Sequence, residues 1–182
     1  MPDDVPVDLP IEKRLAAAVK LYGEDKVVLR ALSLIAGNNE GEEFLLFVGG
    51  EHARDEEQIL LALVVAPVLY WPALWGTRAL LYVWNDTAAD AVAAALRNQA
   101  WRVREMASRV AAARGLPVAP VLAELLVDEV ARVRASAARA LGALGTLDDV
   151  DAIRPLLKDP EMDVRRGAQQ GIEGIRARFP AA

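Results

Sequence analysis

The sequence predicts an all-α protein, an α-solenoid of repeated helix pairs, and two observations carry this prediction. The first is composition: 54% of the 182 residues are hydrophobic, only 5% are aromatic, and alanine is frequent. Such a balance is typical of helices that pack closely through small side chains. The second is a pattern that recurs about every thirty residues, a period characteristic of helical repeats. Together they predict helix pairs stacked along the chain, without a sheet.

The recurring pattern begins with Asp or Asn, places Val-Arg five residues later, and places Ala four residues after the Val. An apolar residue follows seven or eight positions after the Val, so the three positions form one apolar stripe of a helix. The Asp or Asn can cap the backbone N–H groups of that helix. Three clear copies and two fainter ones place their first two stripe residues at Val103 and Ala107, Val133 and Ala137, Val164 and Ala168, Trp75 and Ala79, and Val27 and Ala31.

Further helices are predicted between and before these copies. Second amphipathic segments separate the repeat helices at 87–98, 117–127 and 147–158. In the less regular N-terminal third, start and stop signals predict helices at 11–22, 25–36, 42–48 and 51–66. We expect a single domain over residues 1–182, with irregular helices over 11–70 and recognisable repeats over 71–178.

The pattern Asp-x4-Val-Arg-x2-Ala, clearest over residues 128–142, resembles HEAT-like repeats of the type first noted in phycobilin lyases. The segments YWPALWGTRALLYVWND and AWRVREMA are also similar to a group of short bacterial HEAT-repeat proteins. The resemblance implies a right-handed superhelix in which the repeat helices line the concave face. It also implies a ladder between adjacent repeats, in which arginines bind aspartates: Arg104, Arg134 and Arg165 with Asp128 and Asp159.

Composition excludes several kinds of chemistry. The chain has no cysteine and one histidine, His52. Disulfides, thiolate metal sites and multi-histidine metal centres are therefore excluded. His52 lies beside Glu51, Asp55 and Glu56, which suggests either a weak metal cluster or an acidic first turn of a helix, and we favour the acidic turn. We expect no metal, no cofactor and no catalytic residues.

Charge and hydropathy bear on location and partners. The formal net charge is −5, with 7 Lys and Arg against 15 Asp and Glu over residues 1–90, and 14 against 11 over the remainder. The start, MPDDVPVDLP, does not resemble a secretory signal. Residues 59–77 carry no charge and approach the length of a membrane span, but Pro67 and Pro72 interrupt them. We therefore expect a cytoplasmic protein without a membrane segment.

Charged residues recur beside the apolar stripe of the repeat helices. With Val103, Ala107 and Val110 in the core, arginines at neighbouring positions point to the open side of the helix. Such a strip could hold phosphates or an acidic partner segment; the alternative is a solvated charged face, partly neutralised by Glu105 and Asp163. The predicted binding strip consists of Arg102, Glu105, Arg109, Arg132, Arg139 and Arg166.

Aromatic residues cluster in one part of the chain: all four tryptophans and two of three tyrosines fall within residues 70–101. Trp75 and Tyr82 keep the spacing of the core with Ala79, so we expect both to be buried. Trp71, Trp84 and Trp101 lie at predicted helix ends, where an indole can either pack between repeats or meet a partner. Rings exposed beside Arg102 would have the composition of a binding hot spot.

Glycines recur along the last repeat helix at Gly167, Gly171 and Gly174, where each costs about 1 kcal/mol relative to alanine. Two explanations remain open. The glycines can permit close contact with the preceding helix of the same repeat or with a second subunit, or the terminal repeat is loosely specified.

The function predicted from these features is a non-catalytic interaction scaffold that binds a protein partner on its concave face. The alternative is a nucleic-acid-binding or DNA-glycosylase-like HEAT-repeat protein, for which Asp86 and Asp90 after Trp84 would supply a carboxylate. The net negative charge disfavours that alternative, because phosphate binding requires basic residues. HEAT-repeat di-iron hydroxylases are excluded by the single histidine, and a lyase role rests on repeat type alone.

Overall fold

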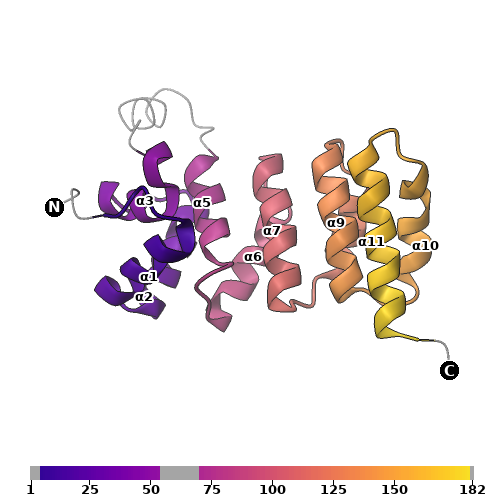
Figure 1. Ribbon diagram of the computed structural model, residues 1–182, viewed down its shortest axis with the longest axis horizontal. Coiled ribbons are helices and arrows are strands. Elements are labelled where there is room, and N and C mark those ends of the chain that lie inside the picture. Colours follow the sequence, from indigo (N-terminus) through magenta and orange to yellow (C-terminus); the bar gives the residue numbers. More distant parts are fainter. Residues whose placement is uncertain (1–4, 54–69, 181–182) are drawn as a thin grey trace. The chain divides into compact units, whose positions relative to one another are not determined.

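The computed structural model describes residues 5–53 and 70–180, and every regular element in these ranges is a helix (Figure 1). The chain divides into two compact units, residues 1–91 and 92–182, and the boundary falls within α6 (Ala89–Ala95). Each unit is described by itself below.

The first unit begins with the predicted helix pair. Helix α1 spans Ile11–Tyr22 and α2 spans Glu24–Ile35, and Gly23 between them has a φ of +84°, which glycine adopts without strain. Helix α3 (Glu42–Gly49) ends at the predicted glycines and continues into the 3-10 turn η2 (Gly50–Ala53). Most of the helix expected at 51–66 lies outside the described residues.

Helix α5 (Trp71–Ala79) packs against α2, and the two fainter copies of the repeat meet at this contact. Val27 and Ala31 of α2 are fully buried, as is Ala79 of α5, and Trp75 is 4% exposed. A Cβ atom at Gly76 would lie 2.5 Å from the Ala31 carbonyl oxygen, so only glycine lets α5 approach α2 this closely. The burial predicted for these stripe residues is confirmed.

A buried arginine that the sequence analysis did not single out ties α1 to its neighbours. The Arg14 guanidinium donates to the carbonyl oxygens of Phe47 at 3.0 Å and Leu9 at 2.6 Å. Its side chain is only 8% exposed, and desolvation lowers its pKa from the ordinary arginine value. Arg14 therefore holds the segment before α1 and the end of α3 together.

The second unit contains the three clear repeat helices, α7 (Trp101–Arg114), α9 (Ala131–Leu144) and α11 (Met162–Arg178). Helix α9 packs against both α7 and α11, and the three lie side by side in Figure 1. Their stripes form the core: Val103, Val133 and Val164 are fully buried, as are the alanines four residues later. The predicted helical stripe is confirmed in all three copies.

A shorter helix and a 3-10 turn precede each repeat helix of this unit. Before α7 the turn comes first, as η3 (Asp86–Ala88), and α6 follows it. Helix α8 (Ala119–Glu124) continues as η4 (Leu125–Val127). Helix α10 (Asp149–Ile153) continues as η5 (Arg154–Lys158). The predicted amphipathic segments are helical, but their α-helical parts are shorter than expected.

The Asp or Asn that recurs at the start of each repeat pattern has a different local role from the one predicted. Asn98, Asp128 and Asp159 each accept a hydrogen bond of 2.9 Å from the N–H two residues later, on Ala100, Val130 and Glu161. Ala100, Val130 and Glu161 are the N-cap residues of the three helices, and their own side chains make no capping hydrogen bond. The Asp and Asn side chains thus close the turn before the helix rather than cap its amides.

The glycines of α11 make a close contact with α9. A Cβ atom would lie 2.7 Å from the Ala135 carbonyl oxygen at Gly167 and 2.9 Å from the Gly142 carbonyl oxygen at Gly174, and it would collide with the Ala138 carbonyl oxygen at Gly171. Close approach is therefore the reason for the glycines. The neighbour is the repeat helix of the preceding repeat, not the partner helix that one of the two explanations named.

Candidate interaction surface

The arginine ladder is the most regular polar feature of the second unit. Arg104 donates two hydrogen bonds, of 2.8 and 3.0 Å, to the Asp128 carboxylate. Arg134 donates two, of 2.9 and 3.0 Å, to Asp159. The resemblance implied these pairs, and both are present. The guanidinium and carboxylate groups of these pairs already bind each other across adjacent repeats. We therefore assign them a structural role rather than a place in a binding surface.

Each ladder arginine also donates to carbonyl oxygens of its own loop. Arg104 binds those of Asn98 and Gln99, and Arg134 binds those of Asp128 and Glu129. Arg165 makes the same contacts with Asp159 and Pro160. Within residues 5–53 and 70–180 it pairs with no carboxylate of a further repeat, so the implied ladder has two complete rungs.

A groove of about 590 Å³ runs over α7, α9 and the start of α11. Its floor is made of small side chains, Ser108, Ala112, Ser136 and Ala140. Its rim carries charged side chains, which include four residues of the predicted binding strip: Glu105, Arg109, Arg132 and Arg139. Asp163 at the start of α11 completes the lining. The structure thus brings much of the strip together on one open surface.

Two of the groove arginines are engaged in ion pairs across repeats. Arg139 of α9 donates to the Asp163 carboxylate at 2.5 Å and to the Gln170 side-chain oxygen at 2.8 Å. Arg132 donates back to the Glu105 carboxylate on α7 at 3.1 Å. These pairs are more exposed than the ladder, since the side chain of Arg132 is 66% exposed and that of Asp163 58%.

Arg109 differs from its counterpart in the next repeat. Arg109 and Arg139 both lie six residues after the repeat valine. Among the described residues Arg109 has neither a hydrogen bond nor an ion pair, and its side chain is exposed. The repeat register explains the difference: the position that is Asp163 in α11 is Arg132 in α9, so arginine stands where Arg109 would need a carboxylate.

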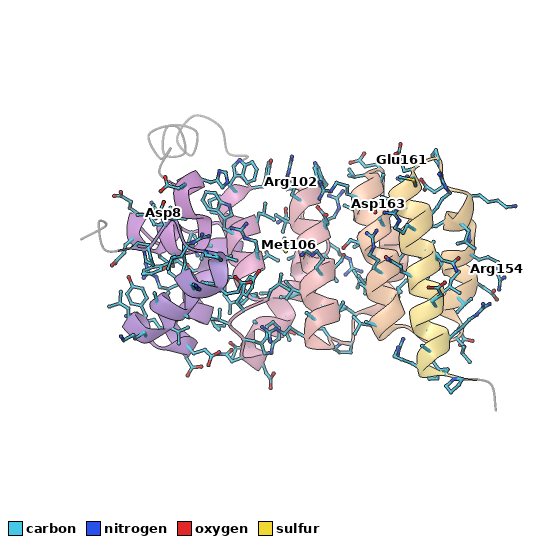
Figure 2. The ribbon with its side chains drawn as sticks, in the orientation of Figure 1. Asp8, Arg102, Met106, Arg154, Glu161 and Asp163 are labelled. Carbon is cyan, nitrogen blue, oxygen red and sulfur yellow. The ribbon has the colours of Figure 1, made fainter. Side chains whose placement is uncertain are left out.

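The electrostatics of the groove favour anions near the start of α11. The pKa of the Asp163 carboxyl is lowered because Arg139 donates a hydrogen bond to it and because the charges of Arg139, Arg166 and Arg132 stabilise its ionised form. Partial burial opposes this shift without cancelling it. Figure 2 shows Asp163 near the start of α11 and Arg102 near the start of α7, at corresponding ends of these helices.

Trp101 borders this surface at the start of α7. The Arg102 guanidinium carbon lies 4.3 Å from the centroid of the indole, and that of Arg132 lies 5.6 Å away. Both distances are within the range of cation–π attraction. Trp101 is half-buried and lies beside these arginine side chains.

The other aromatic residues of the predicted cluster belong to the first unit. Trp71 is half-buried and stacks in a tilted arrangement between Tyr70 and Trp75, with centroids at 4.7 and 6.3 Å. The half-buried Trp84 donates to Asp86 at 3.4 Å. Tyr82 is 39% exposed, so the expectation that it is buried was wrong. Helix α5 ends at Ala79, and the chain leaves the helical spacing on which that expectation depended.

Two further expectations concern metals and membranes. Across residues 5–53 and 70–180, no three His, Cys, Asp or Glu side chains are grouped to hold a metal ion. Asp55 and Glu56, which were considered with His52, lie outside those ranges. Within the same ranges no helix combines the length and hydrophobicity that a membrane span requires.

Comparison with known proteins agrees with the repeat geometry. Residues 88–173 match the family model for HEAT repeats. The fold is similar to that in the crystal structure of an engineered protein from the Northeast Structural Genomics Consortium, with a TM-score of 0.53 and 19% sequence identity over 94% of this chain and 86% of that chain. No curated protein matches the sequence. The HEAT-like repeats predicted from the sequence are supported over residues 88–173, and the all-α solenoid class is confirmed.

Proposed function

We propose that the protein is a non-catalytic interaction scaffold whose protein partner binds in the groove of α7, α9 and the start of α11. HEAT repeats commonly mediate protein interactions, and stacked repeats create the extended surfaces that such interactions use. The observation that carries the proposal is Arg109, an exposed cation that lines the groove and has no partner in the described part of the chain.

The groove suits a peptide or a protein surface in shape as well as charge. Its floor of serine and alanine side chains lets a chain approach the helices, while the charged rim can fix its orientation. Trp101 offers aromatic area at the edge, and tryptophan and arginine are the residues that most often dominate binding energy. Trp71 and Trp84 remain candidate contacts in the first unit.

The experiment is to fill the groove and compare partner capture. Ala112 lines the groove, whereas the next residue, Ala113, is exposed and does not. We expect Ala112→Trp to lose a protein that wild type and Ala113→Trp both retain from a lysate of the source organism. Melting curves would establish that both variants are folded. Equal capture by all three proteins would contradict the location of the site.

Nucleic acid is the second candidate, because the same arginines could bind phosphates. Recovery of nuclease-sensitive material, with an affinity that falls steeply as salt is raised, would favour it. The carboxylates of Glu105 and Asp163 within the groove weigh against a phosphate backbone.

A further inference from the structure

The contact of α7 with α9 and the contact of α9 with α11 are two copies of the same packing, but they carry different charges. The difference indicates the chemistry of a ligand. Between α9 and α11, Arg139 is paired with Asp163 and Gln170. Between α7 and α9, the corresponding position beside Arg109 is occupied by Arg132 and Arg139 rather than by Asp and Gln. The α7–α9 contact therefore has arginines at the positions where the α9–α11 contact has Asp163 and Gln170.

We infer that the groove binds an acidic segment of the partner, and that one carboxylate of this segment pairs with Arg109 as Asp163 pairs with Arg139. This inference rests on the proposed function and names the chemistry of its partner. A carboxylate at this position would accept charge-assisted hydrogen bonds from Arg109, and the exposed guanidinium of Arg132 lines the same groove.

The groove's own carboxylates compete with the incoming one. Glu105 pairs with Arg132, and Asp163 pairs with Arg139. In each pair at least one of the two side chains is exposed. Exposed ion pairs are weak and can be exchanged at little cost. Removal of either internal acid would therefore release an arginine for the partner and strengthen binding.

An acidic peptide agrees with these observations better than a nucleic acid does. A phosphate backbone carries a negative charge at every nucleotide and would run past Glu105 and Asp163. An acidic peptide can instead place its carboxylates at intervals and leave neutral residues over the internal acids.

The test uses fluorescein-labelled peptides of alternating Glu and Gly, with a Gln and Gly peptide of the same length as the neutral control. Fluorescence anisotropy with the full chain at low salt gives the affinity for each. We expect the Glu peptide to bind at least about tenfold tighter than the Gln peptide. Equal affinity for the two peptides would overturn the inference.

Four variants test the residues. Arg109→Gln should weaken binding of the Glu peptide about tenfold, and Arg132→Asp, which removes a groove arginine and supplies an acid from within the chain, should weaken it further. Asp163→Asn should strengthen binding. The matched control is Arg176→Gln, the same substitution as Arg109→Gln on an exposed arginine of α11 outside the groove lining.

The outcomes separate this inference from the proposed function. If Arg176→Gln weakens binding as much as Arg109→Gln, attraction is unspecific and the inference fails. If a single-stranded oligonucleotide binds more tightly than the Glu peptide, the inference fails in favour of nucleic acid. If the Glu peptide does not bind but Ala112→Trp still abolishes partner capture, the acidic chemistry is wrong while the groove remains the site.

Discussion

Arg134 and Asp159 lie 25 residues apart in the sequence, and their side chains are joined by two hydrogen bonds of 2.9 and 3.0 Å. Arg104 and Asp128 repeat this geometry one helix pair earlier. In both rungs the aspartate also closes the turn before its own helix. A single side chain therefore fixes the local turn and joins it to the preceding repeat, which explains why the motif requires Asp and Arg at this spacing.

The ladder should contribute strongly to stability. The Asp128 side chain is 7% exposed and that of Arg104 is 11% exposed, so Asp128→Ala would leave a nearly buried guanidinium without its acid. We expect the free energy of unfolding to fall by about 3 kcal/mol, measured by urea denaturation. The control is Asp151→Ala, which removes the exposed pair with Arg154 and should change stability by less than about 1 kcal/mol. Equal losses would show that the ladder has no special role.

The ladder should also make the protein acid-sensitive. The hydrogen bond from Arg134 lowers the pKa of Asp159 below its ordinary value of 3.8. A carboxyl with a lowered folded pKa contributes stability above the unfolded value, and this contribution is lost as the pH falls from that value through the folded pKa. Wild type should therefore lose stability below about pH 4, and Asp159→Asn should show a smaller loss. Parallel pH profiles for the two proteins would contradict this account.

The close contact of α9 and α11 predicts an unusual response to alanine. Alanine is a better helix former than glycine by about 1 kcal/mol, so Gly171→Ala should stabilise an unconstrained helix. Here its methyl group would meet the carbonyl oxygen of Ala138, and we expect a net loss of about 2 kcal/mol by thermal or urea unfolding. Arg176→Ala, on the exposed face of the same helix, is the control and should be nearly neutral. An increase in stability for Gly171→Ala would show that the contact is loose.

Arg14 should be more important to the first unit than its sequence context indicates. Arg14→Met keeps an unbranched apolar stem but leaves the carbonyl oxygens of Phe47 and Leu9 without this donor. Loss of hydrogen bonds to a charged donor should reduce the free energy of unfolding by roughly 2 kcal/mol. Lys13→Met, at the exposed neighbouring position, should have little effect on the same measurement. A similar change for both variants would contradict the role assigned to Arg14.

Much of the second unit follows from the sequence because its stabilising residues recur. The Val and Ala stripe is buried in every clear copy, and the arginine ladder matches what the resemblance implied. Arg14 could not be predicted in this way, because its partners are backbone carbonyls that carry no residue signature. The exposure of Tyr82 depends on where α5 ends, which the spacing of apolar residues does not determine.

The sequence predicted which residues form the candidate surface but not which of them pair with each other. The offsets from the core placed Glu105, Arg109, Arg132 and Arg139 on one side of their helices, and these four line one groove. Side-chain ion pairs depend on the packing of adjacent helices, so the sequence alone did not separate the engaged Arg139 from Arg109. The structure distinguishes them, because Arg139 pairs with Asp163 whereas the position that corresponds to Asp163 beside Arg109 is Arg132.

The central claim is that a protein partner lies in the groove of α7, α9 and the start of α11. The most direct measurement is photocrosslinking in cells, with a benzoylphenylalanine residue in place of Trp101 at the edge of the groove, where it leaves the groove open, or in place of Ala113 outside the groove lining. We predict a covalent adduct with one protein from position 101 and none from position 113. An adduct from position 113 alone, or equal adducts from both positions, would contradict the location of the partner.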